Sequence, residues 1–113
     1  ARVTGDEVLP LYLAAGVTSI RSTGDEIVAG TLVARVAALH PESSPRVFTC
    51  SPLLDADPPI HRDIGLPVSD PAKVAAVVDD MVAWKVTTLK VYAGSSRPIA
   101  SRTRASAEDE VIP

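Results

Sequence analysis

Hydrophobic residues recur along the chain with two different periods, one typical of helices and one typical of strands. Apolar residues spaced three or four positions apart predict helices over residues 5–15, 28–40 and 70–85. Short segments rich in β-branched residues predict strands at 17–21, 46–50 and 87–92. This alternation predicts an α/β fold in which parallel strands are joined by helical crossovers. The pattern alone leaves two architectures open, part of a barrel or a small doubly wound sheet.

Residues at the ends of the predicted helices support these assignments. Asp70 can cap the third helix, with Pro71 at its first helical position. Gly16 directly follows the first helix and is a good helix stop. In the second helix one apolar stripe is predicted to form the buried face, and it consists of Val28, Leu32, Val36 and Leu39.

Two stretches of the chain lack a periodic pattern. Residues 51–68 contain four prolines and are predicted to form a long loop, which in a compact domain is usually functional or disordered. From Ser95 onward neither period continues, which predicts a tail that is mobile or forms a short helix of low stability. We therefore divide the chain into a βα-repeat unit at 1–94 and an irregular tail at 95–113.

Composition and charge exclude several classes of function. The net charge of −3 and the absence of a Lys/Arg cluster argue against a nucleic-acid partner. No apolar run approaches the roughly 20 residues that a membrane span needs. The single cysteine, Cys50, excludes an internal disulfide, and together with an N-terminus unlike a signal peptide it predicts a cytoplasmic protein. The chain begins with Ala1 and not with Met, so we expect a part of a longer protein or a cleavage product.

Lys90 is the first candidate for chemistry. In the strand at 87–92, Thr88, Lys90 and Tyr92 share one face, and Leu89 and Val91 share the other. If the apolar face packs against helices, Lys90 points to the opposite side, which in a closed barrel is the interior near the active-site rim. A lysine there needs an opposite charge or a covalent modification. On periodicity alone, an edge-strand lysine in water is favoured, because lysines are mostly exposed.

The remaining polar candidates are weaker. His61, in the proline-rich loop, is read as a substrate-pocket residue or, with more support, as an exposed loop histidine. His40 suits the negative end of the helix dipole, and Cys50 suits a small buried position. The loop carboxylates are predicted to be solvated, because their spacing does not match a calcium loop; they are Asp55, Asp57 and Asp63.

Three segments together resemble the amidohydrolase superfamily, most closely its imidazolonepropionase-like and prolidase-like branch. Residues 9–21 are similar to a helix leading into that branch's Gly-Val-Thr-Thr-x-Arg-Asp strand. Residues 45–55 resemble its third strand and the following loop, and residues 89–92 its fourth-strand Ile-Lys-Val-Tyr motif. Order and spacing agree from Leu9 to Gly94, which is most of the chain.

The resemblance implies a partial TIM-type (β/α)8 barrel and a metal-dependent hydrolase that acts on C–N bonds of a small amide or peptide. By that resemblance Lys90 is a carboxylated lysine whose carbamate bridges divalent metal ions, with Zn²⁺ the expected metal. The metal would acidify a bound water that attacks the carbonyl. His61 and Tyr92 are the candidate substrate-binding residues.

The sequence also departs from the family pattern. The His-x-His pair, the later histidine ligands and the catalytic aspartate are absent, and Ser22 stands where the family commonly has aspartate. One ligand cannot hold a catalytic ion, so the chain alone is expected to bind no metal and to be inactive. The alternative is a non-catalytic α/β binding module or a remnant of a truncated or frameshifted gene. A half barrel would also leave open sheet edges, through which we expect self-association.

Overall fold

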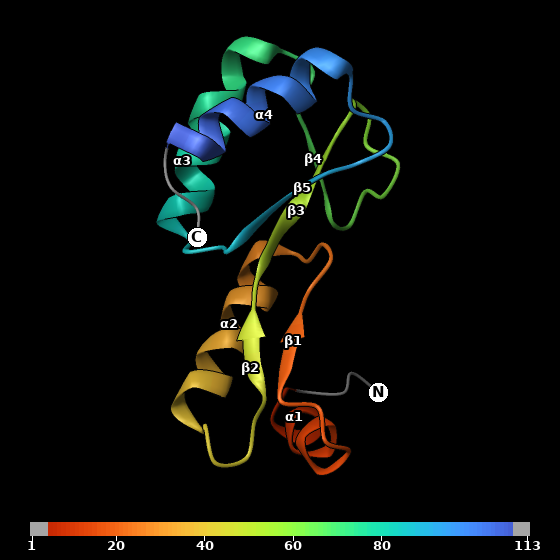
Figure 1. Cartoon of the computed structure of the whole chain (residues 1–113). Helices are drawn as coiled ribbons and strands as arrows, with labels where there is room; N and C mark the ends of the chain where they lie inside the picture. Colours follow the sequence, from red (N-terminus) through yellow and green to blue (C-terminus); the bar gives the residue numbers. More distant parts are fainter. Residues whose placement is uncertain (1–4, 110–113) are drawn as a thin grey trace.

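The computed structural model describes residues 5–109, in which four α-helices alternate with parallel strands (Figure 1). The elements are α1 (Gly5–Ala14), β1 (Ser19–Arg21), α2 (Ile27–Leu39), β2 (Arg46–Phe48), β3 (Cys50–Asp55), β4 (Gly65–Pro67), the 3₁₀ helix η1 (Pro71–Lys73), α3 (Val74–Ala83), β5 (Thr88–Val91) and α4 (Arg97–Asp109). The predicted mixed α/β class with parallel strands is confirmed.

The strands form two small sheets that share one extended segment. β1 pairs in parallel with β2, and β3 lies between β4 and β5 and is parallel to both. Only Thr49 separates β2 from β3, so residues 46–55 run through both sheets (Figure 1). In register, Ile20 is paired with Val47 in the first sheet, and Leu54 with Val91 in the second.

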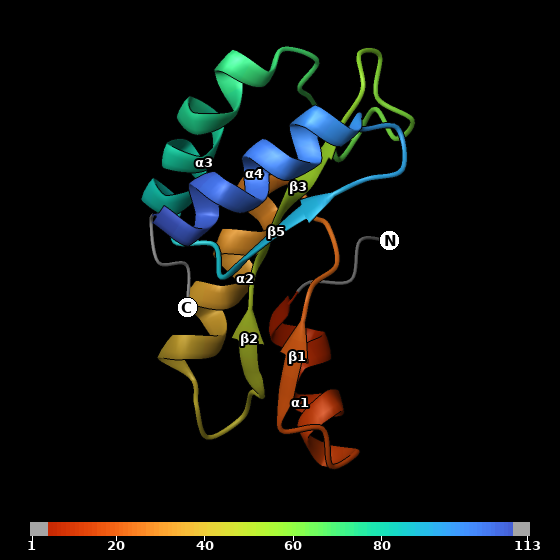
Figure 2. The ribbon, with the colours of Figure 1, turned by 45° about the horizontal axis from the view of Figure 1, so that its top comes forward.

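The main hydrophobic core lies between the second sheet and the last two α-helices. Its central residues are Leu54, Val68, Val74, Val78 and Ile99. Both views show α3 and α4 side by side next to β5 (Figures 1 and 2). The helices therefore cover one face of the β4-β3-β5 sheet, and this decides which strand residues face away from them.

Local capping explains where the helices begin and end. Gly16 has a φ of +86°, its N–H donates to Leu13 O, and the next N–H, of Val17, donates to Tyr12 O. This is the glycine-terminated helix end that the sequence predicts. η1 and α3 start at Asp70, whose carboxylate accepts a hydrogen bond from the N–H of Ala72 at 2.9 Å, also as predicted.

The prediction of one long loop at 51–68 is wrong at both ends, because β3 extends to Asp55 and β4 forms at Gly65–Pro67. The loop is predicted because this stretch contains four prolines. Pro52 falls at the register shift between Cys50 and Leu53, where a strand tolerates the missing N–H. Pro67 lies in β4, a strand at the edge of its sheet, where a proline is also tolerated.

The predicted buried face of the second helix is also wrong. Val28, Leu32 and Leu39 are exposed, by as much as 73% for Leu39. The buried residues of α2 are small, Gly30 and Ala37. α2 contacts β2, and its larger apolar residues Val28, Leu32 and Leu39 lie on the exposed part of its surface.

The tail predicted to be irregular forms the 13-residue helix α4 over most of its length. Its buried face consists of Ile99 and Thr103, one helical turn apart, with exposed fractions of 1% and 3%. Thr103 Oγ1 donates to Ile99 O, which satisfies the buried hydroxyl. Two buried residues are too sparse a stripe to produce a clear helical period. Residues 110–113 of the predicted tail lie outside the described residues.

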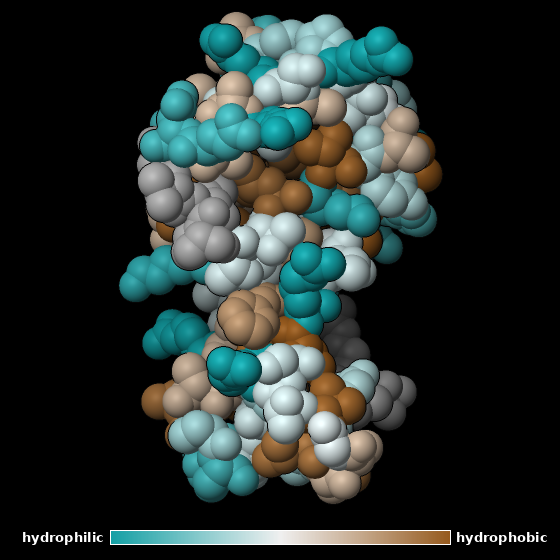
Figure 3. All heavy atoms as spheres, viewed as in Figure 1, coloured by the Kyte–Doolittle hydropathy of each residue, from teal (hydrophilic) through white to brown (hydrophobic). Residues whose placement is uncertain are grey.

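The chain is elongated for its length. Its extents are 43 × 32 × 20 Å and its radius of gyration is 15.1 Å, whereas a compact domain of this size is expected near 13 Å. Figure 3 shows a narrow waist between an upper and a lower half. None of the helices within residues 5–109 is long and apolar enough to cross a membrane.

If α4 is part of the folded core, Ile99→Ala will lower the free energy of unfolding by about 2–5 kcal/mol. The cause is the cavity left beside Val74 and Val78. The matched control is Ile60→Ala, because Ile60 is 60% exposed, and it is expected to change stability by less than about 0.5 kcal/mol. Urea denaturation followed by circular dichroism measures both. Equal, small effects of the two substitutions would contradict the packing of α4.

Candidate functional site

The loops that follow the parallel strands define the edge of the sheet where a site is expected. Residues 22–26 follow β1, residues 56–64 follow β3, and residues 92–96 follow β5. Parallel strands point their carboxyl ends in one direction, and ligands of α/β folds bind outside those ends. The sequence candidates His61 and Tyr92 both lie in these loops.

Lys90 lies on the face of β5 that the helices leave uncovered. Its neighbour Leu89 packs against the main core, and Val91 lines a surface hollow with Ala100 and Thr103 of α4. Since side chains alternate along a strand, Lys90 points to the opposite face. The predicted orientation of the apolar face of this strand is therefore confirmed, whereas the role of Lys90 stays a prediction.

Lys90 itself is half-buried, and neighbouring residues enclose part of it. Its backbone N–H donates to Ser51 Oγ at 2.9 Å, and it is in register with Leu53. Leu53 is itself buried, because the loop after β1 approaches it so closely that a Cβ on Gly24 would overlap its side chain. The helix-free face near Lys90 is thus partly closed by the loop after β1.

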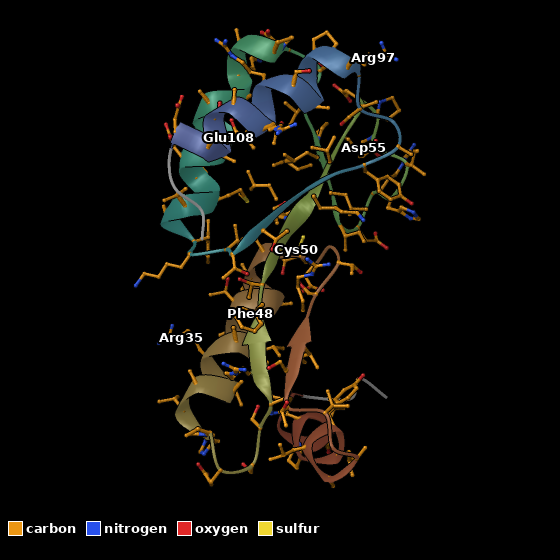
Figure 4. The ribbon with its side chains drawn as sticks, in the orientation of Figure 1. Arg35, Phe48, Cys50, Asp55, Arg97 and Glu108 are labelled. Carbon is orange, nitrogen blue, oxygen red and sulfur yellow. The ribbon has the colours of Figure 1, made fainter. Side chains whose placement is uncertain are left out.

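Cys50 shares this face, because it is in register with Thr88, two residues before Lys90. Figure 4 shows Phe48, Cys50 and Asp55 spaced along the extended segment. Burial raises the pKa of the Cys50 thiol, and the charge of Asp25 adds to the increase. The positive charge of Lys90 opposes it and lowers that pKa. Cys50 is free and buried, as the sequence predicts, and its raised pKa argues against a nucleophile.

His61 and Tyr92 form a pair at the carboxyl edge. His61 Nε2 lies 3.0 Å from Tyr92 Oη, and the rings meet edge to face with centroids 5.3 Å apart. If Nε2 carries the proton, it donates to the tyrosine oxygen and leaves the Tyr92 O–H free to donate elsewhere. In the other tautomer Tyr92 donates to His61, and its oxygen remains an acceptor. The structure brings together the two predicted substrate-binding residues, although their role is not thereby shown.

The expectation of a solvated carboxylate is wrong for Asp55, which is completely buried at the end of β3. Its carboxylate accepts hydrogen bonds from the N–H groups of Ala56 and Ile60. Sequence reasoning placed it with Asp57 in a loop because Pro52 concealed the strand. The signal that could have identified it is its position directly after the apolar pair Leu53 and Leu54, at the end of a strand.

The described residues alone do not make a metal centre. Within residues 5–109 no group of three or more His, Cys, Asp or Glu side chains could hold an ion. His40 has Nδ1 3.5 Å from Glu42 Oε1 on an exposed surface, and His61 contacts Tyr92, so neither lies in a ligand set. Lys90 is the remaining candidate, and a single ligand does not fit a bound ion.

The influence of Lys90 on Cys50 gives a test of the shared face. Replacing Lys90 by Gln removes a positive charge that lowers the Cys50 pKa, so the thiol becomes less ionised and its alkylation slows. Each unit of pKa increase lowers the rate about tenfold at a pH below the pKa. Iodoacetamide labelling followed by mass spectrometry measures the rate. The control Lys73→Gln, at an exposed lysine on the helical side, should leave the rate unchanged. An unchanged rate in Lys90→Gln would contradict the shared face.

Comparisons with known proteins give one informative similarity. No protein-family model matches the sequence, and no curated protein sequence matches it. Among solved structures, bottromycin amidohydrolase superposes with a TM-score of 0.78 at 28% sequence identity. The match covers 93% of this chain and 23% of that protein's chain. The chain thus has the fold of a part of bottromycin amidohydrolase, and this similarity supports a relationship to a hydrolase.

Proposed function

We propose that the chain is part of the catalytic domain of a metal-dependent amidohydrolase that hydrolyses a C–N bond in a small amide or peptide substrate. The similarity to bottromycin amidohydrolase is the observation that carries the proposal, because it spans nearly the whole chain at 28% identity. Assignment to the imidazolonepropionase-like and prolidase-like branch rests on the sequence resemblance of residues 9–21, 45–55 and 89–92.

The proposed architecture is a segment of a (β/α)8 barrel whose other strands lie in the remainder of the domain. The parallel strands and the helices on one face of β3 and β5 support it. The exposed apolar residues support it as well, because large exposed apolar surfaces usually mark contact sites. On α2 these residues are Val28, Leu32 and Leu39.

In this domain Lys90 would supply one ligand of the metal centre. Its half-buried position on the helix-free face, which would become the barrel interior, supports that role. As a carbamate its side chain would offer hard anionic oxygens to divalent ions such as Zn²⁺. The other ligands would come from strands outside residues 5–109, because one ligand cannot hold the ion.

His61 and Tyr92 are proposed to bind the polar group of the substrate. They lie at the carboxyl edge of the sheet, where substrate loops gather in this type of fold. A hydroxyl already held by an imidazole is oriented before a ligand arrives, which lowers the entropic cost of binding. We also infer a reducing, cytoplasmic location, supported by the single free cysteine.

A chimera tests the proposal. The corresponding segment of bottromycin amidohydrolase is replaced by this chain, and bound metal and turnover of that enzyme's own substrate are measured. The chimera is expected to bind a divalent metal, and Lys90→Ala to lose it and to reduce turnover by more than about 100-fold, beyond the range of an outer-shell substitution. Lys90→Glu, which restores an anionic oxygen, should retain part of the metal.

The control in the chimera is Lys73→Ala, at an exposed lysine of η1, which should keep both metal and turnover. Full metal content and full turnover in Lys90→Ala would contradict the role of Lys90. A folded chimera that binds no metal would contradict the hydrolase proposal and favour a non-catalytic α/β module.

The proposed open architecture also predicts the behaviour of the isolated chain. β1 and β5 each have a hydrogen-bonded neighbour on one side only among the described strands. Strand edges of this kind pair with other chains, so we expect oligomers that dissociate on dilution. Light scattering coupled to size-exclusion chromatography measures the mass. A chain that stays monomeric across the whole concentration range would contradict the self-association.

A further inference from the structure

Asp55 is buried at a place where two loops meet, and no charged side chain within residues 5–109 forms a salt bridge with it. Its side chain has no solvent exposure, and a buried carboxylate is costly unless hydrogen bonds compensate it. The loop after β3 provides that compensation. Asp55 Oδ1 accepts a hydrogen bond from the N–H of Ala56 at 2.9 Å, and Oδ2 accepts one from the N–H of Ile60 at 2.7 Å. The two oxygens therefore hold both ends of a five-residue turn.

The loop after β5 presses against the same carboxylate. Gly94 lies so close that a Cβ at this position would overlap Asp55 Oδ1 and would contact the Cβ of Ala56 at 3.3 Å. Next to it, Ser95 Oγ donates to Leu54 O at 2.6 Å, and the same carbonyl accepts from the N–H of Tyr92. Asp55 and its neighbour thus fix the loop that begins with Tyr92.

These contacts determine where the two rings of the pair lie. His61 follows Ile60 directly, and its carbonyl accepts a hydrogen bond from the N–H of Gly65 at 2.7 Å, which closes the loop before β4. His61 is itself exposed, so little packing restrains its ring apart from Tyr92. The position of His61 over Tyr92 therefore depends on the turn that Asp55 holds.

We propose that Asp55 is a positioning residue, which holds the loops after β3 and β5 together so that His61 and Tyr92 form one hydrogen-bonded unit. The positioning follows from the contacts of Asp55, and only the description of the unit as a substrate site rests on the proposed function. Both carboxylate oxygens are needed. Asparagine would keep one acceptor and would turn an N–H donor toward the other backbone N–H.

The test is nuclear magnetic resonance of the full chain, which requires no enzymatic activity. The wild type is expected to show nuclear Overhauser effects between the ring protons of His61 and Tyr92, together with slow exchange of the Ile60 amide. In Asp55→Asn the ring effects should disappear, and one of the two loop amides, Ala56 or Ile60, should exchange roughly tenfold faster or more, because a hydrogen bond to a charged group is lost. Contacts between Ile99 and Val78 in the core should persist.

Two further variants make the result decisive. Asp57→Asn applies the same chemical change to an exposed carboxylate of the same loop and should leave the pair intact. Gly94→Ala keeps the carboxylate but displaces it from the other side, and it should separate the rings in the same way. If Asp55→Asn does not fold, the ring contacts between His61 and Tyr92 in Gly94→Ala decide whether Asp55 positions the pair. Ring contacts that persist in a folded Asp55→Asn or in Gly94→Ala would overturn the positioning role.

Discussion

One extended segment, residues 46–55, provides the hydrogen-bonding partner for each of the other described strands. Its first part pairs with β1, and its second part pairs with β4 and β5. All these pairings are parallel, so the strand ends and their loops share a direction. Alternation places Leu53 and Leu54 on opposite faces, with Leu54 on the helical one, and the register shift between Cys50 and Leu53 brings Cys50 onto the face of Leu53. The location of Lys90 follows from its register with Leu53.

The sequence indicated the fold where apolar periods and capping residues agree, and it failed where an apolar residue does not face the core or a proline does not break a strand. Asp70 caps the start of its helix, and Gly16 ends the helix before it, as their chemistry requires. Pro52 could not be predicted to lie in a strand, because its tolerance depends on a register shift that only pairing with β5 creates. In α2 the small residue Gly30 is buried and the large residue Leu32 is exposed, which a search for large apolar residues cannot detect.

In the candidate site, too, some features could be predicted from the sequence and others could not. The face of β5 on which Lys90 lies follows from the alternation of side chains within one strand, so it could be predicted. Contact between His61 and Tyr92, which are 31 positions apart, could not, because it depends on the turn that Asp55 stabilises. A buried carboxylate bonded to backbone N–H groups leaves only a weak sequence signal, here the position of Asp55 directly after Leu53 and Leu54. The similarity to bottromycin amidohydrolase covers 23% of that chain, so this chain corresponds to a part of that structure.

The central cluster of the core belongs entirely to one half of the molecule, and this has a consequence for cooperativity. All five of its residues follow Phe48 in the sequence; they are Leu54, Val68, Val74, Val78 and Ile99. The half built from α1, β1, α2 and β2 contributes no residue to that cluster. Besides the backbone segment, it meets the other half through the loop after β1, where Ser22 Oγ accepts a hydrogen bond from the N–H of Cys50 at 2.8 Å and Gly24 approaches Leu53. Such an arrangement allows the first half to open as a separate foldon while α3 and α4 remain packed.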